Sequence, residues 1–155
     1  MIRKLLVNEV SEIKNLIDPY VKQGLMLPKS LHSLFTGIRD FWVTTEDGPD
    51  RQSIIGCCAL QVSWMDLAEI RTLAVKQEYQ GAGIGREMVK ACIREAEELR
   101  LKTVFTLTYV PDFFKKMGFH EIDKATLPNK IWADCIHCQY FPDCRETALI
   151  YRIEG

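Results

Sequence analysis

Apolar and polar positions alternate along several short segments and recur at helical spacing in others. Apolar residues spaced by three and four predict helices from Ser11 to Val21, from Ser30 to Ile38, and for about four turns from Ile84. FFKKM before Gly118 predicts a short helix that begins at Pro111-Asp112 with an aspartate cap. Strands are predicted over 2–7, 41–45, 53–62, 66–75, 103–108, 119–122 and 147–153. The order β-α-α-β-β-β-α-β-α-β-β favours an α+β fold of mixed α/β layers, with the sheet covered by helices.

Length and charge narrow the class of protein. With 155 residues the chain predicts one domain over 1–155, carrying an irregular, cysteine-containing excursion at about 130–145. Apolar residues are 47% and charged residues 26%, as in globular proteins, and the net charge of −1 argues against nucleic acid as the main partner. No apolar run approaches the roughly 18 residues of a membrane span, and the N-terminus turns polar too soon for a signal peptide. A cytoplasmic protein is expected.

A glycine-rich turn follows the strand predicted over 66–75. Gln80-Gly81-Ala82-Gly83-Ile84-Gly85 opens directly onto a predicted helix, where bare backbone N–H groups and the helix dipole favour an anion. A Walker A loop requires a lysine after its last glycine, and none follows Gly85. A dinucleotide fingerprint requires a last glycine at the position where this chain has Arg86. A turn without a ligand is the alternative.

The turn and its surroundings resemble the GNAT superfamily of acetyltransferases. The six residues from Gln80 match its Q/R-x-x-G-x-G/A signature, and FFKKMGF at 113–119 matches its second landmark. The resemblance implies a central mixed, mostly antiparallel sheet and a turn that wraps the diphosphate of acetyl-CoA. The residues it assigns to the cofactor are Leu73, Ala74, Val75, Gln80, Gly81, Ala82, Gly83, Ile84, Gly85 and Arg86. Val75 and its neighbours would act through their main chain, whereas Arg86 is alternatively a solvated helix residue.

The same resemblance points to Glu69 as the general base. An acidic residue within an apolar strand is unusual, and partial burial would raise its pKa toward neutrality. The alternative is a Glu69 paired with a basic residue at the sheet surface. Phe114 stands where many relatives carry the tyrosine that protonates the departing thiolate. Tyr109, Thr108 or water would then supply that proton.

A narrower resemblance concerns the acceptor. The segment QGLMLPKS at 23–30, the strand from Glu69 to Val75, and residues 104–128 resemble the acetyltransferase domain of N-acetylglutamate synthases. This implies L-glutamate as the amine substrate, arginine biosynthesis as the setting, and no amino-acid kinase domain. Lys29 stands where that family has an arginine, and alternation puts Arg71 on the same side of its strand as Glu69. Lys29 is alternatively a surface lysine and Arg71 an ion-pair partner of Glu69. The substrate-binding candidates are Leu27, Lys29, Arg71, Thr72 and Thr108.

The six cysteines fall into two groups. Cys57, Cys58 and Cys92 lie in apolar patterns and are interpreted as core residues. The remaining candidates for a metal are Cys135, His137, Cys138 and Cys144, whose spacing allows a tetrahedral zinc site, packed thiols or a redox pair.

Three functions remain from the sequence. The leading hypothesis is an acetyl-CoA-dependent N-acetyltransferase for L-glutamate that works by direct attack, with a homodimer allowed. The second is a GNAT enzyme for another amine, such as another amino acid, a polyamine or a protein N-terminus. The third is a non-catalytic regulatory domain that binds acyl-CoA or a metal.

Overall fold

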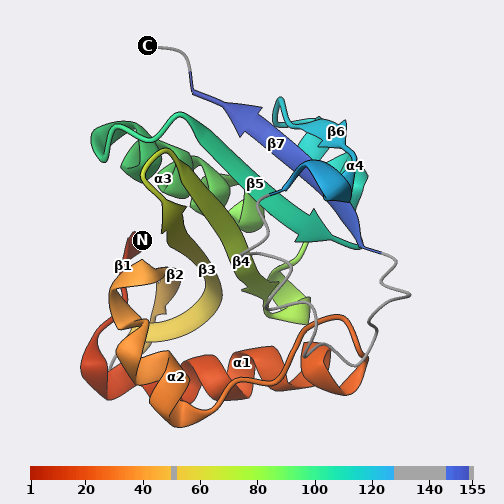
Figure 1. Cartoon of the computed structure of the whole chain (residues 1–155). Helices are drawn as coiled ribbons and strands as arrows, with labels where there is room; N and C mark the ends of the chain where they lie inside the picture. Colours follow the sequence, from red (N-terminus) through yellow and green to blue (C-terminus); the bar gives the residue numbers. More distant parts are fainter. Residues whose placement is uncertain (50–51, 128–145, 154–155) are drawn as a thin grey trace.

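The computed structural model describes residues 1–49, 52–127 and 146–153. Within these residues seven strands form one sheet in the order β1-β2-β3-β4-β5-β7-β6 (Figure 1). β4 and β5 run parallel, and the other described neighbours pair antiparallel. The strands are β1 (Ile2–Lys4), β2 (Phe41–Asp47), β3 (Gln52–Trp64), β4 (Leu67–Val75), β5 (Thr103–Thr108), β6 (His120–Ile122) and β7 (Thr147–Arg152). The predicted element order and the mixed α/β class are confirmed.

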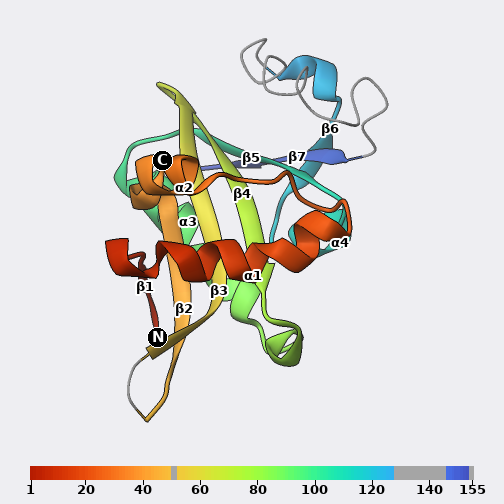
Figure 2. The same ribbon diagram turned by 90° about the horizontal axis from the view of Figure 1, so that it is seen from below.

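Helices cover both faces of the sheet. α1 (Val10–Lys22) and α2 (Leu31–Thr36) lie on one face, where Ile13 and Leu34 pack in a fully buried cluster with residues of β2 and β3. α3 (Ile84–Glu98) and α4 (Pro111–Lys115) lie on the other, where Met88 and Phe114 share a second core cluster. Figure 2 shows α1 crossing the sheet on the face opposite α3. None of the helices in the described ranges is long and apolar enough to span a membrane.

A bulge interrupts β4 and decides where its side chains point. Ala74 pairs with Cys57 and Arg71 with Ala59, so Thr72 and Leu73 together face the single residue Cys58. Thr72 adopts a left-handed φ of 55°. Ahead of the bulge, Ala68 and Ile70 pack toward α3, whereas Ala74 beyond it packs toward α1. By alternation Glu69 and Arg71 therefore lie on the α1 face of the sheet.

β4 and β5 separate after Ile70, just ahead of the bulge. Their parallel pairing runs from Leu67 and Thr103 to Ile70 and Thr106. Figure 1 shows the two strands diverging after that point. The last residues of β4 are consequently held by β3 on one side, and β5 leads away from them toward α4. The glycine turn, which follows β4, and the end of β5 therefore lie beyond the point where the two strands stop pairing.

Two local predictions are wrong. The first strand ends at Lys4 rather than at residue 7, because Val7–Glu9 forms a 3-10 helix in which the Glu9 carboxylate accepts the Leu6 N–H at 3.0 Å. Asp112 does not cap α4: the residue before the helix is Val110, whose N–H donates to Thr108 Oγ1 at 3.0 Å. The start of the second helix at Ser30 is confirmed: Ser30 directly precedes α2, and its hydroxyl accepts the Ser33 N–H.

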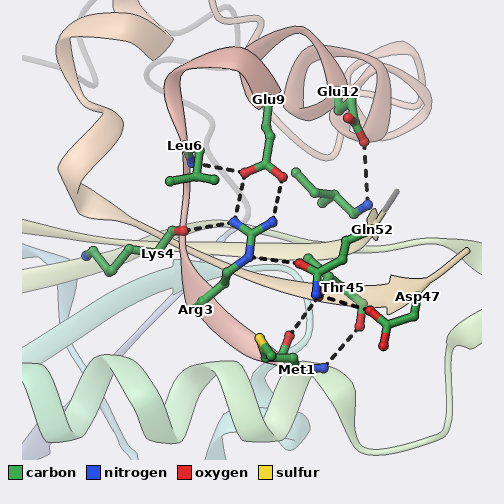
Figure 3. A network of polar contacts seen from close by, with 10 residues as sticks. Met1, Arg3, Lys4, Leu6, Glu9, Glu12, Thr45, Asp47 and Gln52 are labelled. Carbon is green, nitrogen blue, oxygen red and sulfur yellow. Dashed lines mark hydrogen bonds and ion pairs between the residues drawn. The ribbon is translucent and has the colours of Figure 1, made fainter. Parts of the chain in front are cut away.

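A polar network ties β1 to the start of α1 (Figure 3). The Arg3 guanidinium donates to both Glu9 carboxylate oxygens, at 2.8 and 2.6 Å. The pKa of Arg3 is raised above its ordinary value, chiefly by the hydrogen bond to Glu9. Gln52 of β3 accepts from Arg3 Nε at 3.3 Å, so the network also reaches the adjacent hairpin.

Glu9→Ala is expected to lower the free energy of unfolding by about 2 kcal/mol, because it removes a two-bond ion pair and leaves the half-buried Arg3 without its carboxylate. Asp18→Ala is the matched control, since Asp18 pairs with Lys22 at an exposed i,i+4 position worth about 0.5 kcal/mol or less. Urea unfolding of both variants measures the difference. Equal losses would show that the Arg3 network adds nothing beyond a surface pair.

Candidate active site

The glycine turn joins the end of β4 to the start of α3. Gly81 and Gly83 adopt left-handed φ angles of 85° and 82°, and Gly83 is the residue directly before the helix. A Cβ on either would meet no atom within 4 Å, so the backbone conformation, not crowding, requires glycine there. Such a turn leaves the first N–H groups of the 15-residue helix α3 without intrahelical partners. The arrangement suits a diphosphate.

The residues beside the turn have different environments. A Cβ on Gly85 would lie 3.5 Å from the Phe113 ring, so α4 approaches the first turn of α3 here. Ile84 is half-buried against the core cluster that contains Met88 and Phe114, called the α3 core below. Ala82 and the Arg86 side chain are exposed. Gln80 is directed away from the turn: its amide donates to the Tyr20 hydroxyl at 2.7 Å and to the Val75 carbonyl at 3.3 Å.

The end of β4 presents its main chain beside the turn. Leu73 and Val75 pack against the α3 core, and Ala74 packs on the opposite face. The Lys76 N–H donates to the Ile55 carbonyl at 2.8 Å, which fixes the strand end on β3. Since pairing with β5 stops at Ile70, the backbone from Arg71 to Val75 is the part of β4 that leaves the parallel ladder.

Glu69 and Arg71 lie on one face of β4, as alternation predicts. Arg71 Nη1 is 3.9 Å from Glu69 Oε1, and both side chains are largely buried, at 26% and 16% exposed. Arg71 Nη1 also donates to Gln61 Oε1 of β3 at 2.5 Å, and Gln61 stands opposite Glu69 in the ladder. Sequence reasoning missed Gln61, although period-2 pairing of the β3–β4 hairpin was the signal that could have found it.

A second carboxyl group lies near Arg71. Asp40 ends the short 3-10 helix Ile38–Asp40 before β2. Burial raises the pKa of Asp40, while the positive charges of Lys4 and Arg71 lower it in part. The pKa of Asp40 is thus set by burial and by charges from β1, α3 and β4.

The candidates for the general acid lie at the end of β5. Thr108 is buried and its hydroxyl accepts the Val110 N–H at 3.0 Å, and Tyr109 beside it is half-buried. Phe114 is 2% exposed and packs edge-on against Phe113 at 5.0 Å between ring centroids. The place of the usual tyrosine is therefore filled by a core side chain.

The α1–α2 loop carries Leu27 and Lys29. Leu27 is 40% exposed, and Lys29 is half-buried with its carbonyl accepting from Lys14 Nζ at 3.1 Å. Thr72 is instead buried within the β4 bulge, where its carbonyl accepts from Cys57 Sγ at 3.3 Å. Lys29 and Leu27 thus belong to the helical layer, whereas Arg71 and Thr72 belong to the sheet.

The described cysteines are core residues, as the sequence indicates. Cys57, Cys58 and Cys92 are fully buried, and burial raises the pKa of Cys57 to about 12. Cys92 Sγ lies 3.7 Å from Cys58 Sγ, and this contact together with burial raises the pKa of Cys58 well above its usual value. Thiols in this state are unreactive.

The predicted zinc ligands lie in a part of the chain that the structure does not describe. Cys135, His137, Cys138 and Cys144 lie outside the described residues, so a metal there stays a prediction. In the ranges that the structure does describe, no group of three or more His, Cys, Asp or Glu side chains is arranged to hold a metal ion.

Sequence comparisons connect this geometry to known proteins. A family model described as "Acetyltransferase (GNAT) domain" matches residues 37–121. The chain is 38% identical over 149 residues to the uncharacterized N-acetyltransferase CT2212 of Chlorobaculum tepidum, covering 96% of this chain and 94% of that protein. It is 39% identical over 133 residues to an amino-acid acetyltransferase of Mycobacterium tuberculosis, covering 85% of this chain and 75% of the relative.

A solved structure of similar shape carries ligands. N-acetylglutamate synthase from Neisseria gonorrhoeae, complexed with coenzyme A and N-acetyl-glutamate, superposes with a TM-score of 0.89 at 25% identity. The match covers 100% of this chain and 35% of the synthase, so the present chain spans about a third of that protein.

Proposed function

Because this chain belongs to the GNAT family of acetyltransferases and is an acetyl-CoA-dependent acyltransferase, we propose that it acetylates the α-amine of L-glutamate. The observation that carries the proposal is the placement of Glu69 and Arg71, 3.9 Å apart, on the strand that leads into the glycine turn. A base and a cation side by side suit an acceptor that offers both an ammonium and a carboxylate. This reaction belongs to arginine biosynthesis.

The glycine turn supplies the cofactor site in this proposal. Backbone N–H groups around Gly81, Gly83 and Gly85, at the positive end of α3, bind the diphosphate of acetyl-CoA. Acetyl-CoA supplies the activated thioester. The main chain of Leu73, Ala74 and Val75, free of the β5 ladder, donates to the carbonyl oxygen on which charge develops.

Glu69 performs the proton transfer. Its carboxylate takes a proton from the substrate ammonium, and the resulting amine attacks the thioester carbon. The attacking nitrogen gives up its second proton to solvent as the C–S bond breaks, and the departing thiolate takes a proton, for which the hydroxyls of Tyr109 and Thr108 at the end of β5 are the candidates. Direct attack of this kind needs both substrates bound together, which avoids a covalent enzyme intermediate.

Substrate carboxylates require fixed cationic donors. Arg71 has five N–H donors and gives one to Gln61, which orients the guanidinium and leaves further donors for a carboxylate. Lys29, beside Leu27 on the α1–α2 loop, is proposed as the second cation. Lysine binds as a point charge rather than as a planar fork, so Arg71 carries the larger share of the specificity.

The test is thiol release from acetyl-CoA with a matched panel of acceptors. We expect kcat/KM for L-glutamate to exceed that for L-glutamine and for 4-aminobutyrate by about tenfold or more, because each lacks one carboxylate and leaves a cation unpaired. L-Aspartate, other amino acids and polyamines complete the panel. Rates for glutamate no better than for the rest would remove the glutamate assignment and leave the acetyltransferase.

A further inference from the structure

A three-residue junction joins α1 to the glycine turn. Tyr20, in the last turn of α1, donates its hydroxyl proton to the Val75 carbonyl at 2.6 Å. The same hydroxyl oxygen accepts from Gln80 Nε2 at 2.7 Å, and Gln80 Nε2 also reaches the Val75 carbonyl at 3.3 Å. The Tyr20 phenol therefore joins α1 to Val75, the last residue of β4, and to Gln80, the first residue of the glycine turn. α1 lies on the opposite side of the sheet from α3.

The turn needs such an anchor. Gly81 and Gly83 are exposed glycines with left-handed φ angles, so the free turn has much backbone freedom to lose when it closes on an anion. β4 has already left β5 at this point and is held by β3, through the pairing of Val75 with Gly56. Tyr20 supplies an attachment from the α1 side, and fixing Gln80 fixes the residue from which the turn starts.

Gln80 is occupied by this contact. In the described conformation its amide group points to Tyr20 and Val75 rather than outward from the turn. A diphosphate could then be bound by the main chain of the turn while the Gln80 side chain holds that main chain in place. This differs from a direct side-chain contact between Gln80 and phosphate.

Tyr20 is also attached to the other substrate loop, through its main chain. The Leu25 N–H donates to the Tyr20 carbonyl at 3.0 Å, which begins the loop that carries Leu27 and Lys29. Removing the phenol oxygen alone leaves this contact intact. The side chain and the main chain of Tyr20 can therefore be tested separately.

We propose that Tyr20 is a positioning residue that preorganises the diphosphate turn by holding Val75 and Gln80, and that Gln80 acts through Tyr20. The inference rests on the proposed role of the turn in binding coenzyme A. It does not depend on which amine is acetylated. Preorganisation lowers the ordering cost of binding, so its loss appears as weaker affinity without loss of a ligand contact.

The test is a double-mutant cycle read by calorimetry with coenzyme A. Tyr20→Phe, Gln80→Ala and the double variant are each expected to bind coenzyme A about tenfold more weakly than the unchanged protein, because the two residues act as one unit. The KM for acetyl-CoA should rise in parallel while the KM for the acceptor stays within about twofold. Tyr151→Phe, at a half-buried tyrosine packed on Phe119 of the α3 core, is the matched control and should retain full affinity.

Two outcomes would overturn the inference. Wild-type affinity in Tyr20→Phe would show that the hydroxyl does not position the turn. Losses that multiply to about a hundredfold in the double variant would show that Gln80 binds phosphate independently. Thermal unfolding of each variant separates these results from misfolding. A protein that binds coenzyme A but does not prefer glutamate would refute the proposed acceptor and leave this test valid.

Discussion

Glu69→Gln is expected to lower kcat by about 10²–10⁴-fold, because it removes the group that accepts the ammonium proton while keeping the size and shape of the side chain. The affinity for coenzyme A should stay unchanged, since Glu69 lies ahead of the bulge and the glycine turn lies beyond it. Steady-state thiol release and calorimetry measure the two quantities. A variant that loses turnover and keeps the cofactor would separate an enzyme from a domain that only binds acyl-CoA.

Glu121→Gln is the control for this experiment. Glu121 is an exposed residue of β6 that pairs with Lys115 at 3.2 Å, and its replacement should leave kcat unchanged. If Glu69→Gln instead keeps kcat within about fivefold, Glu69 acts as the structural partner of Arg71. The general base would then have to be sought elsewhere.

Gly83→Ala is expected to weaken coenzyme A binding by about tenfold or more. Alanine at a φ of 82° costs about 1–2 kcal/mol, and relief of that strain turns the backbone N–H groups away from the anion. Calorimetry with coenzyme A measures the loss. Because a side chain at this position meets no atom within 4 Å, steric exclusion inside the protein is not the cause.

Gly118→Ala supplies the matched comparison. Gly118 also has a left-handed φ, of 97°, but it ends α4 and lies outside the turn. The variant should lose at least as much stability, because a Cβ on Gly118 would also lie 3.3 Å from the Tyr151 ring, and it should keep its affinity for coenzyme A. Equal affinity losses in both variants would indicate general destabilisation, and full affinity in Gly83→Ala would rule out the turn as the diphosphate site.

Local signals made most of the fold predictable. The apolar stripe from Ile84, the start of α2 at Ser30 and the stop at Gly118 each depend on neighbours close in sequence, and the structure has all three. The aspartate cap failed because Pro111 occupies the first helical position, so that Val110 precedes the helix and Asp112 is its second residue. Such small differences depend on contacts that a pattern does not encode.

The site was less predictable because its contacts are long-range. Thr72 adopts a left-handed φ although it is β-branched, so nothing in its residue type signals the bulge that turns Ala74, rather than Leu73, to the face of β4 that carries Glu69 and Arg71. In the sequence Tyr20 is one apolar position of a predicted helix, yet its hydroxyl donates to the carbonyl of Val75, 55 residues later in the chain. Gln61 likewise contacts Arg71 only once β3 and β4 are in register.

The most direct test of the account is a titration of coenzyme A into isotopically labelled protein, followed through backbone amide resonances. Gly81, Gly83 and Gly85 should show the largest shifts, and shortening coenzyme A to pantetheine, which lacks the diphosphate, should abolish them. Shifts that leave the glycine turn untouched while the protein binds coenzyme A would contradict it.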